Sequence, residues 1–433
     1  MWKISKYLYI WKEKEKAVLY CTHNGCIINL TSNEAKIVES LQDKEFEQSE
    51  VKEDIFQALV KNEIIVSADK DETLEILKAH KSVIENSDKL HLTLFITDEC
   101  NFNCYYCFVD KSKRKYMDEA TWDKVKLFIE KRVCGYKGLS ISWFGGEPLE
   151  RKIELCKYSN QLRDLCWEKG ISYYAKIVTN GYDLTKDVFQ ELYFAGINSF
   201  QITFDGYQTY HDTIRVHERY GKTFDRIITN LKEIKKLEYE DIGVLIRCNM
   251  VNDVDNEIEK FIKLYQKEFE KDKRFGLQVK PIVNYGSNIK SELLLTYINK
   301  ISMLSGLASK YEVLDSVLTD KFYPRRIWCS TLNPHAFVVA PDGKVFTCDS
   351  TVNNQKYCYG VITHDGAFEE NPKFDKSYFE QKQGETCLEC KKFPICFGTC
   401  QYIYHKVKKH ACALSDKDIQ VFLQYIISKQ EKS

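Results

Sequence analysis

The sequence lacks a long apolar run, an excess of either charge and a secretion signal, and each absence excludes a class of protein. No apolar stretch approaches the roughly 18–20 residues that a membrane-spanning helix needs, so no membrane span is expected. The 63 basic and 63 acidic residues give a formal net charge of zero, which offers no general attraction to nucleic acid or to an anionic membrane. Residues 1–7 contain no apolar segment of the kind found in signal peptides, and we expect a cytoplasmic protein.

Cysteine, by contrast, is abundant, with 17 residues in a chain of 433. Disulfides are rare in cytoplasmic proteins, so this abundance indicates metal binding. Hydrophobic residues make up 44% of the chain and aromatic residues 13%, which is enough for packed cores. The length predicts two to four domains of about 100–200 residues each.

Three cysteines lie on one short loop, Cys100, Cys104 and Cys107, directly after an apolar run at 92–97 that reads as a buried strand. Three thiolates occupy three corners of a four-iron cluster and leave the fourth iron open to a small ligand. A structural or electron-carrying cluster normally has four protein thiolates. A zinc site is the alternative, but structural zinc sites usually combine two C-x2-C pairs or Cys/His sets. An open iron at the end of a strand is a catalytic arrangement.

The middle of the chain alternates apolar strands with amphipathic helices, such as those at 118–132 and 224–236. This alternation predicts a parallel sheet with right-handed crossovers. The predicted strands are at 91–97, 139–144, 172–178, 198–204, 242–248 and 275–283.

The C-x3-C-x2-C spacing, with Tyr106 just before the last cysteine, resembles the signature of radical S-adenosylmethionine (SAM) enzymes. The resemblance implies that SAM chelates the open iron and is cleaved to a 5′-deoxyadenosyl radical, which abstracts hydrogen from a substrate. It also implies a partial (β/α)6 barrel. In such barrels the chemistry lies at the carboxyl ends of the strands.

Two further motifs follow predicted strands. Gly145, Gly146 and Glu147 resemble the family's GGE motif, since paired glycines let a backbone approach closely and a carboxylate can pair with the SAM ammonium. Thr179 and Asn180 resemble a SAM-contacting turn, with an ordinary Asn-Gly turn as the alternative.

The fourth and fifth strands carry two more candidates. Asp205, within Thr203-Phe-Asp-Gly, resembles a residue of peptide-modifying members that would contact SAM ribose or substrate. Arg247 lies on the fifth strand, where it either points inward toward SAM or lies on the surface.

The last hundred residues carry a second set of cysteines whose spacing resembles the SPASM extension of radical SAM enzymes, which binds two auxiliary four-iron clusters. By this resemblance one set holds the outer cluster and another the inner cluster. The outer set is Cys387, Cys390, Cys396 and Cys412, and the inner set is Cys329, Cys348 and Cys400. The fourth inner ligand is left open between Cys358, His335 and no side chain. Zinc bound by the same thiolates is the alternative.

Asp349 directly follows Cys348. Its position resembles that of an aspartate proposed as general base in the sulfatase-maturing branch, where it would take the proton lost on oxidation of a substrate radical. It equally fits a turn cap.

Residues 1–88 precede the barrel pattern. They predict strands at 4–11, 17–20 and 27–30, a helix begun by a capping box of Thr31 and Glu34, a helix at 51–61 and a strand at 64–66. The order suggests a winged-helix-like module, whose counterpart in peptide-modifying enzymes binds the leader of a precursor peptide as an added strand. DNA is the poorer partner, because the segment has no basic stripe. Residues 67–90 predict a connecting helix.

We therefore expect three domains: a leader-recognition module at 1–88, a partial barrel at 89–320 and a SPASM domain at 321–433. The whole resembles a maturase of ribosomally made peptides that forms a cross-link, with a thioether favoured and a carbon–carbon bond next. Its expected partners are a precursor peptide and an electron donor such as flavodoxin or ferredoxin. Two alternatives remain, a sulfatase-maturing enzyme that forms formylglycine and a non-catalytic scaffold that binds zinc.

Overall fold

The computed structural model describes residues 1–250, 255–282, 297–324, 329–352, 354–379, 386–398, 400–407 and 412–430. The chain divides into two compact units. The first contains residues 1–86, 296–332 and 378–433, and the second contains residues 87–295 and 333–377. The domain boundaries expected at 88 and 320 stay predictions.

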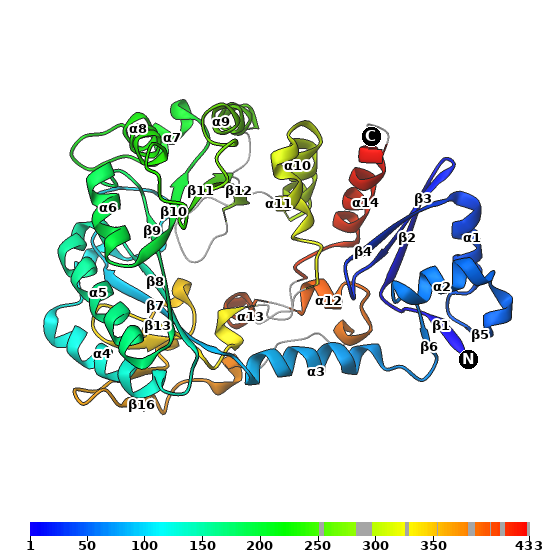
Figure 1. The fold of residues 1–433 in the computed structure, drawn as a ribbon, viewed down its shortest axis with the longest axis horizontal. Helices are drawn as coiled ribbons and strands as arrows, with labels where there is room; N and C mark the ends of the chain where they lie inside the picture. The colour runs from blue at the N-terminus through cyan, green and yellow to red at the C-terminus, as the bar shows by residue number, and fades with distance from the viewer. Residues whose placement is uncertain are drawn as a thin grey trace. The chain divides into compact units, whose positions relative to one another are not determined.

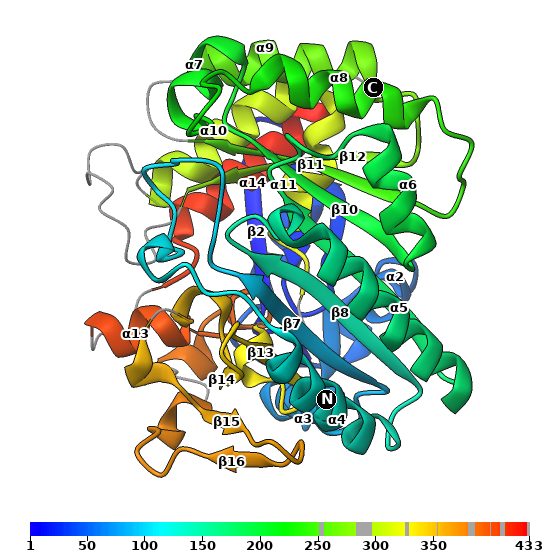
Figure 2. The same cartoon turned by 90° about the vertical axis from the view of Figure 1, so that its left-hand side faces the viewer.

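The second unit is built on six parallel strands that lie in the order of the chain (Figures 1 and 2). They are β7 (Lys89–Thr97), β8 (Gly138–Gly145), β9 (Ser172–Thr179), β10 (Ile197–Phe204), β11 (Gly243–Met250) and β12 (Phe275–Pro281). Every bound in the described residues agrees with the predicted strands to within two residues. The predicted α/β class with a parallel central sheet is confirmed.

Helices connect these strands and cover the outer face of the sheet, as Figure 1 shows. In α4, for example, the Asp118 side chain caps the first turn by accepting from the Thr121 N–H, and Trp122 and Phe128 are buried. The helices are α4 (Glu119–Val133), α5 (Lys152–Lys169), α6 (Lys186–Phe194), α7 (Gln208–Ile214), α8 (Phe224–Lys235) and α9 (Asp255–Glu268).

Four short strands extend the sheet beyond β7, and the sequence did not predict this extension. β13 (Ala336–Val339) pairs in parallel with β7, and β14 (Lys344–Phe346), β15 (Gly360–Ile362) and β16 (Phe368–Glu370) follow in antiparallel order. The part of the chain that carries Cys348 and Cys358 is thereby attached to the strand that precedes the first cysteine loop.

The first unit begins with two small antiparallel sheets. β1 (Trp2–Ile4) lies between β5 (Glu45–Phe46) and β6 (Ile65–Ser67), and β2 (Leu8–Glu13), β3 (Lys16–Cys21) and β4 (Cys26–Thr31) form a meander. The prediction of one strand at 4–11 was wrong, because the chain turns between β1 and β2. Glu72 holds this turn, since its carboxylate accepts from the Ser5 hydroxyl at 2.5 Å and from the Lys6 N–H at 3.1 Å.

Three helices accompany these sheets, as predicted: α1 (Ser32–Ser40), α2 (Glu53–Lys61) and α3 (Glu72–Glu85). The capping box of Thr31 and Glu34 at the start of α1 is present. Later parts of the chain supply α10 (Tyr297–Lys310), α11 (Asp315–Thr319), α12 (Phe393–Cys396), α13 (Gln401–Val407) and α14 (Asp416–Gln430). In the described residues, no helix is long and apolar enough to cross a membrane.

The core of the first unit joins residues from both ends of the chain. Leu19, Phe46 and Phe56 of the N-terminal strands and helices form one buried cluster with Phe393 and Phe397. Phe393 and Phe397 stack on each other with ring centroids 4.7 Å apart. The N-terminal module is therefore packed against the segment that carries Cys390 and Cys396.

Candidate functional site

The loop with Cys100, Cys104 and Cys107 follows β7, and each of the three residues is partly buried. Phe102, in the middle of the loop, is buried and forms an isolated β-bridge with His217. Its N–H donates to the Cys100 sulfur at 3.4 Å. The loop is therefore anchored at its centre.

Gly145, the last residue of β8, and Gly146, which follows it, support the start of this loop. The Gly146 N–H donates to the Thr97 carbonyl at 2.8 Å. A Cβ atom on Gly145 would lie 2.2 Å from the Thr97 carbonyl oxygen, and one on Gly146 would lie 2.0 Å from the Glu99 carbonyl oxygen. Side chains at both positions would collide with backbone, so glycine is required for the cysteine loop to pack here.

Glu147 is buried and its carboxylate joins the ends of β8 and β9. It accepts from the Thr179 hydroxyl at 2.6 Å, the Asn180 N–H at 2.7 Å and the Leu149 N–H at 3.1 Å. Burial raises the pKa of Glu147 to about 7, although these three hydrogen bonds favour the ionised form. The structure thus brings Glu147, Thr179 and Asn180 together, and their roles as SAM contacts stay predictions.

Asn101 belongs to the same polar group and was missed by sequence reasoning. Its side chain accepts from the Asn180 amide at 2.8 Å and donates to Asp183 at 2.9 Å. Asn101 is a loop residue between two cysteines, and nothing in the local sequence indicated that its side chain makes these contacts. These contacts fix the cysteine loop to the turn after β9.

Tyr106 and Asp205 also meet. The Tyr106 hydroxyl donates to the buried Asp205 carboxylate, with oxygen distances of 2.7 and 2.9 Å. It accepts from Arg215 Nη1 at 2.8 Å and from the Asn249 amide at 3.2 Å. A phenol has one donor and two acceptor sites, so this hydroxyl is fully occupied by protein groups.

Arg215 and Asn249 were missed by sequence reasoning, and Arg247 lies nearby. Arg247 Nε donates to Asn249 Oδ1 at 3.0 Å, and the Asn249 amide donates to Asp205 at 3.0 Å. The predicted residues Tyr106, Asp205 and Arg247 are thereby linked through one asparagine. Their roles as SAM contacts stay predictions.

The chemistry of the first three cysteines fits an iron–sulfur cluster. In the described residues no group of three or more His, Cys, Asp or Glu side chains could hold a single metal ion. A four-iron cluster is larger, and each thiolate binds a different iron. Burial, with the Glu147 charge second, raises the pKa of Cys100 to about 12. Burial also raises the pKa of Cys104, against the opposing effect of the Arg215 charge. Thiolates in such surroundings need a cation, and soft sulfur ligands select iron–sulfur clusters or zinc.

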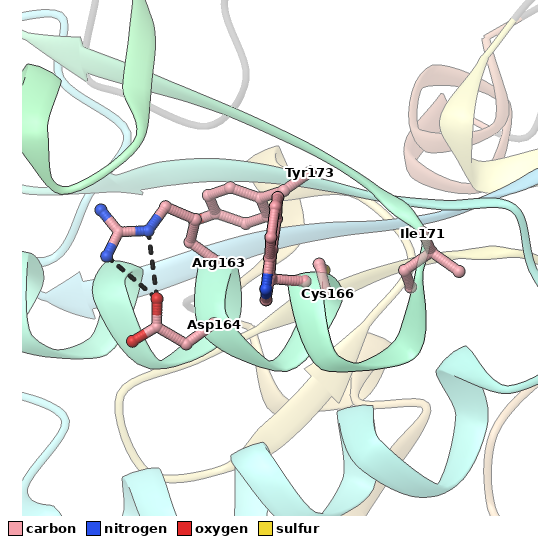
Figure 3. A pocket seen from close by; sticks show the side chains of 6 residues that line it. Arg163, Asp164, Cys166, Ile171 and Tyr173 are labelled. Carbon is pink, nitrogen blue, oxygen red and sulfur yellow. Dashed lines mark hydrogen bonds and ion pairs between the residues drawn. The ribbon is translucent and has the colours of Figure 1, made fainter.

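A cavity of about 410 Å³ lies at the other end of β9 (Figure 3). Arg163, Cys166 and Tyr173 line it, and Arg163 Nη2 is 2.9 Å from Asp164. Thr179 lies six positions after Tyr173 along β9, which is a rise of roughly 20 Å along a strand. This cavity is therefore separate from the cysteine loop.

The outer set of C-terminal cysteines lies in the first unit. The Cys390 N–H donates to the Cys387 carbonyl at 3.0 Å, which places both thiols on one turn. Burial is the largest of the effects that raise the pKa of Cys396, and the charges of Cys412 and Cys390 act in the same direction. The structure thus brings Cys390, Cys396 and Cys412 within electrostatic range of one another.

The inner set is divided between the units, with Cys329 and Cys400 in the first unit and Cys348 and Cys358 in the second. Cys348 follows β14 and Cys358 precedes β15, and these strands are paired antiparallel, so both cysteines lie at the same end of the hairpin. Cys358 is buried and its thiol donates to the Gly360 carbonyl at 3.3 Å. The ligand set of this cluster stays a prediction.

Two candidates near this hairpin have local partners. His335 Nδ1 lies 2.7 Å from the Tyr136 hydroxyl. Asp349 is exposed and accepts from the Ser350 N–H at 2.8 Å, while its Oδ1 is 3.7 Å from the Cys348 sulfur. Asp349 therefore has a local backbone partner, and its roles as a base or as a turn cap stay predictions.

Residues 94–265 match the family model described as the Radical SAM superfamily. A cysteine-type anaerobic sulfatase-maturating enzyme from Clostridium novyi is 24% identical over 335 residues, which cover 70% of this chain and 86% of the relative.

Two solved structures have a similar fold. Native anSMEcpe with bound AdoMet has a TM-score of 0.59 and 20% identity, and the match covers 79% of this chain and 97% of that one. Streptococcus suis SuiB bound to precursor peptide SuiA has a TM-score of 0.52 and 16% identity, and the match covers 94% of this chain and 98% of that one. Residues 94–265 therefore form a radical SAM domain, which implies a four-iron cluster and SAM as cofactors, and the chain is an enzyme.

Proposed function

We propose that this chain is a radical SAM maturase that installs a cross-link, preferably a thioether, in a ribosomally made precursor peptide. One observation carries the proposal. The likeness to SuiB extends over 94% of this chain, whereas the likeness to anSMEcpe extends over 79%. SuiB is described with a precursor peptide, and a fold shared over nearly the whole chain supports a similar use of the N-terminal module.

The N-terminal module offers sheet edges to which a leader peptide can add. In the meander β2-β3-β4, the outer strands are β2 and β4. A strand added to such an edge gains main-chain hydrogen bonds, while side-chain pockets give specificity. We propose that the leader binds the module in this way, and that an electron donor such as flavodoxin or ferredoxin is the second partner.

The residues around the first cysteine loop hold and orient the cofactors in this proposal. Cys100, Cys104 and Cys107 bind the cluster, and the Gly145-Gly146 backbone supports their loop. When bound, the cluster and SAM supply a 5′-deoxyadenosyl radical that removes hydrogen from the peptide. Glu147 is the proposed partner of the SAM ammonium. Burial raises the pKa of its carboxyl to about 7, and the positive charge of the ammonium would favour its ionised form.

The C-terminal cysteines complete the proposal. Cys387, Cys390, Cys396 and Cys412 would hold an outer auxiliary cluster. Cys329, Cys348 and Cys400, with Cys358, His335 or an open iron, would hold an inner one. Such clusters accept electrons, which the oxidation of a peptide radical releases. The total would be three four-iron clusters.

The product is tested by incubating the anaerobically reconstituted chain with SAM, a reductant and a candidate precursor peptide that contains cysteine. A thioether forms a carbon–sulfur bond while one C–H and one S–H bond break, so the peptide loses a pair of hydrogen atoms. The cysteine also becomes resistant to alkylation. A peptide of unchanged mass, in a reaction that does form 5′-deoxyadenosine, would contradict the cross-linking proposal.

Leader recognition is tested separately, by fluorescence anisotropy with the full-length chain. A labelled leader peptide without its core is expected to bind, and the core peptide alone is expected to bind weakly. Equal binding of both would place recognition outside the N-terminal module.

A sulfatase-maturing function is the second candidate, favoured by the relative from Clostridium novyi and by the contact between Cys348 and Asp349. Its product on a sulfatase-derived cysteine peptide is an aldehyde, in which oxygen replaces sulfur. A hydrazide reagent traps this aldehyde and leaves a thioether unchanged, so the two functions give different products.

A further inference from the structure

A buried arginine lies beside the first cysteine loop. Arg215 directly follows α7 and is 7% exposed. Its Nη1 donates to the Tyr106 hydroxyl at 2.8 Å and lies 3.9 Å from Asp205. Its guanidinium carbon is 5.6 Å from the centre of the Phe102 ring. Arg215 thus contacts side chains on both sides of Cys104 in the loop.

The backbone holds this charge in place. The Asn103 N–H donates to the Val216 carbonyl at 2.9 Å, and the Glu218 N–H donates to the Asn101 carbonyl at 2.8 Å. The segment after Arg215 is therefore paired with the loop itself. A charge held by such pairing keeps its position relative to the thiols, unlike a flexible surface arginine.

One donor of Arg215 is unused. Its Nε–H is buried and has no hydrogen-bond partner in the described part of the chain. A buried donor without a partner costs free energy, so such groups usually serve a bound ligand, ion or water.

We propose that Arg215 sets the reduction potential of the iron–sulfur cluster held by Cys100, Cys104 and Cys107. Reduction adds one electron to the cluster, and a fixed positive charge in a water-poor site stabilises the more negative form. Arg215 is thus a positioning and electrostatic residue that makes the cluster easier to reduce. The proposal rests on the cluster that the radical SAM domain implies and is independent of the peptide chemistry proposed above.

Asp205 acts with the opposite sign. Its carboxylate lies 3.9 Å from Arg215 Nη1 and accepts from the Tyr106 hydroxyl at 2.7 Å, so a negative charge lies beside the same loop. Loss of the Asp205 charge should therefore make the cluster easier to reduce, and loss of the Arg215 charge should make it harder. A merely structural role predicts no such opposition.

The test is a redox titration of the full-length reconstituted protein, with dithionite and mediators and without peptide. The electron paramagnetic resonance signal that changes on addition of SAM identifies this cluster. Arg215→Met is expected to lower the equilibrium constant for reduction of the cluster about tenfold, which lowers its reduction potential by ~59 mV for one electron. Arg215→Lys keeps the charge and should stay near the wild-type value, and Asp205→Asn should shift the potential upward.

Arg163→Met is the matched control, because Arg163 also pairs with an aspartate but lies at the far end of β9. Its cluster should have the wild-type potential. Potentials that move in the same direction for Arg215→Met and Asp205→Asn would overturn the proposal. An unchanged potential in Arg215→Met would do so as well, as would a wild-type protein whose SAM-sensitive signal is absent. If the variants shift the potential as expected but the wild-type protein does not modify a precursor peptide, the proposed function fails and this proposal stands.

Discussion

The backbone of Gly146 lies so close to Glu99 that a Cβ atom would come within 2.0 Å of the Glu99 carbonyl oxygen. The Glu147 N–H donates to that same carbonyl at 2.7 Å. The turn after β8 therefore packs directly against the backbone at the start of the cysteine loop.

Gly146→Ala should push the turn after β8 and the cysteine loop apart. Overpacking against backbone costs about 1–3 kcal/mol, and the cysteine loop is the element that must move. We expect a lower free energy of unfolding in urea and less iron bound by the reconstituted protein. Gly135→Ala is the control, since a Cβ there meets no atom within 4 Å. Equal iron content in both variants would show that the contact does not support the loop.

Substitution of Cys100, Cys104 or Cys107 by Ala should abolish 5′-deoxyadenosine formation, because each removes one iron ligand. Chromatography of the reaction measures it. Cys134→Ala should retain product, since that thiol is exposed at the end of α4. Product from all three loop variants would refute the cluster assignment. Colourless protein with stoichiometric zinc would instead support the non-catalytic scaffold.

Glu147 should make stability depend on pH. Its pKa is raised from 4.5 to about 7, so the folded protein binds the proton more tightly than the unfolded chain does. Stability from this group is complete below about pH 4.5 and is lost as the pH rises to about 7, by about 3 kcal/mol in total. Urea unfolding of the metal-free protein, compared with Glu147→Gln, measures the difference. A difference that is constant across this range would contradict the burial effect.

Tyr106→Phe should destabilise the loop, because Asp205 and Arg215 each lose a buried hydrogen-bond partner. The expected cost is about 1–3 kcal/mol in the free energy of unfolding. Tyr105→Phe is the neighbouring control, since Tyr105 is exposed, and it should change stability by less than about 0.5 kcal/mol. SAM affinity, measured by calorimetry on reconstituted protein, should stay within a few-fold in Tyr106→Phe if the hydroxyl serves only protein groups. A large loss of affinity without a loss of stability would assign the hydroxyl to SAM.

Phe393→Ala should loosen the N-terminal module although it lies some three hundred residues away in the chain. Phe393 is 2% exposed within the shared core, and truncation of a buried phenylalanine costs about 3–5 kcal/mol. Hydrogen exchange followed by mass spectrometry should show faster exchange in residues 1–86. Phe194→Ala, at a side chain that is 63% exposed, should leave exchange there unchanged. Unchanged exchange in Phe393→Ala would separate the module from the C-terminal segment.

The six central strands could be predicted because apolar residues recur along each of them and amphipathic helical segments separate them; in β8 and β10, for example, buried residues alternate with half-buried ones. The strand predicted at 4–11 was wrong because Glu72, far away in the sequence, imposes the turn between β1 and β2. Arg215 and Asn101 could not be found for a similar reason. They meet only because residues 216–218 pair with residues 101–103, and neither segment carries a local signal of that pairing. The extension of the sheet from β13 to β16 likewise depends on pairing with β7.

The shared core of the first unit also has a consequence for synthesis. Residues 1–86 are made well before Phe393 and Phe397, which complete their core and follow some three hundred residues later. At about 5–20 residues per second, that delay is roughly 15–60 s. During this interval the nascent N-terminal segment exposes apolar surface, which makes it a natural client for chaperones at the ribosomal exit.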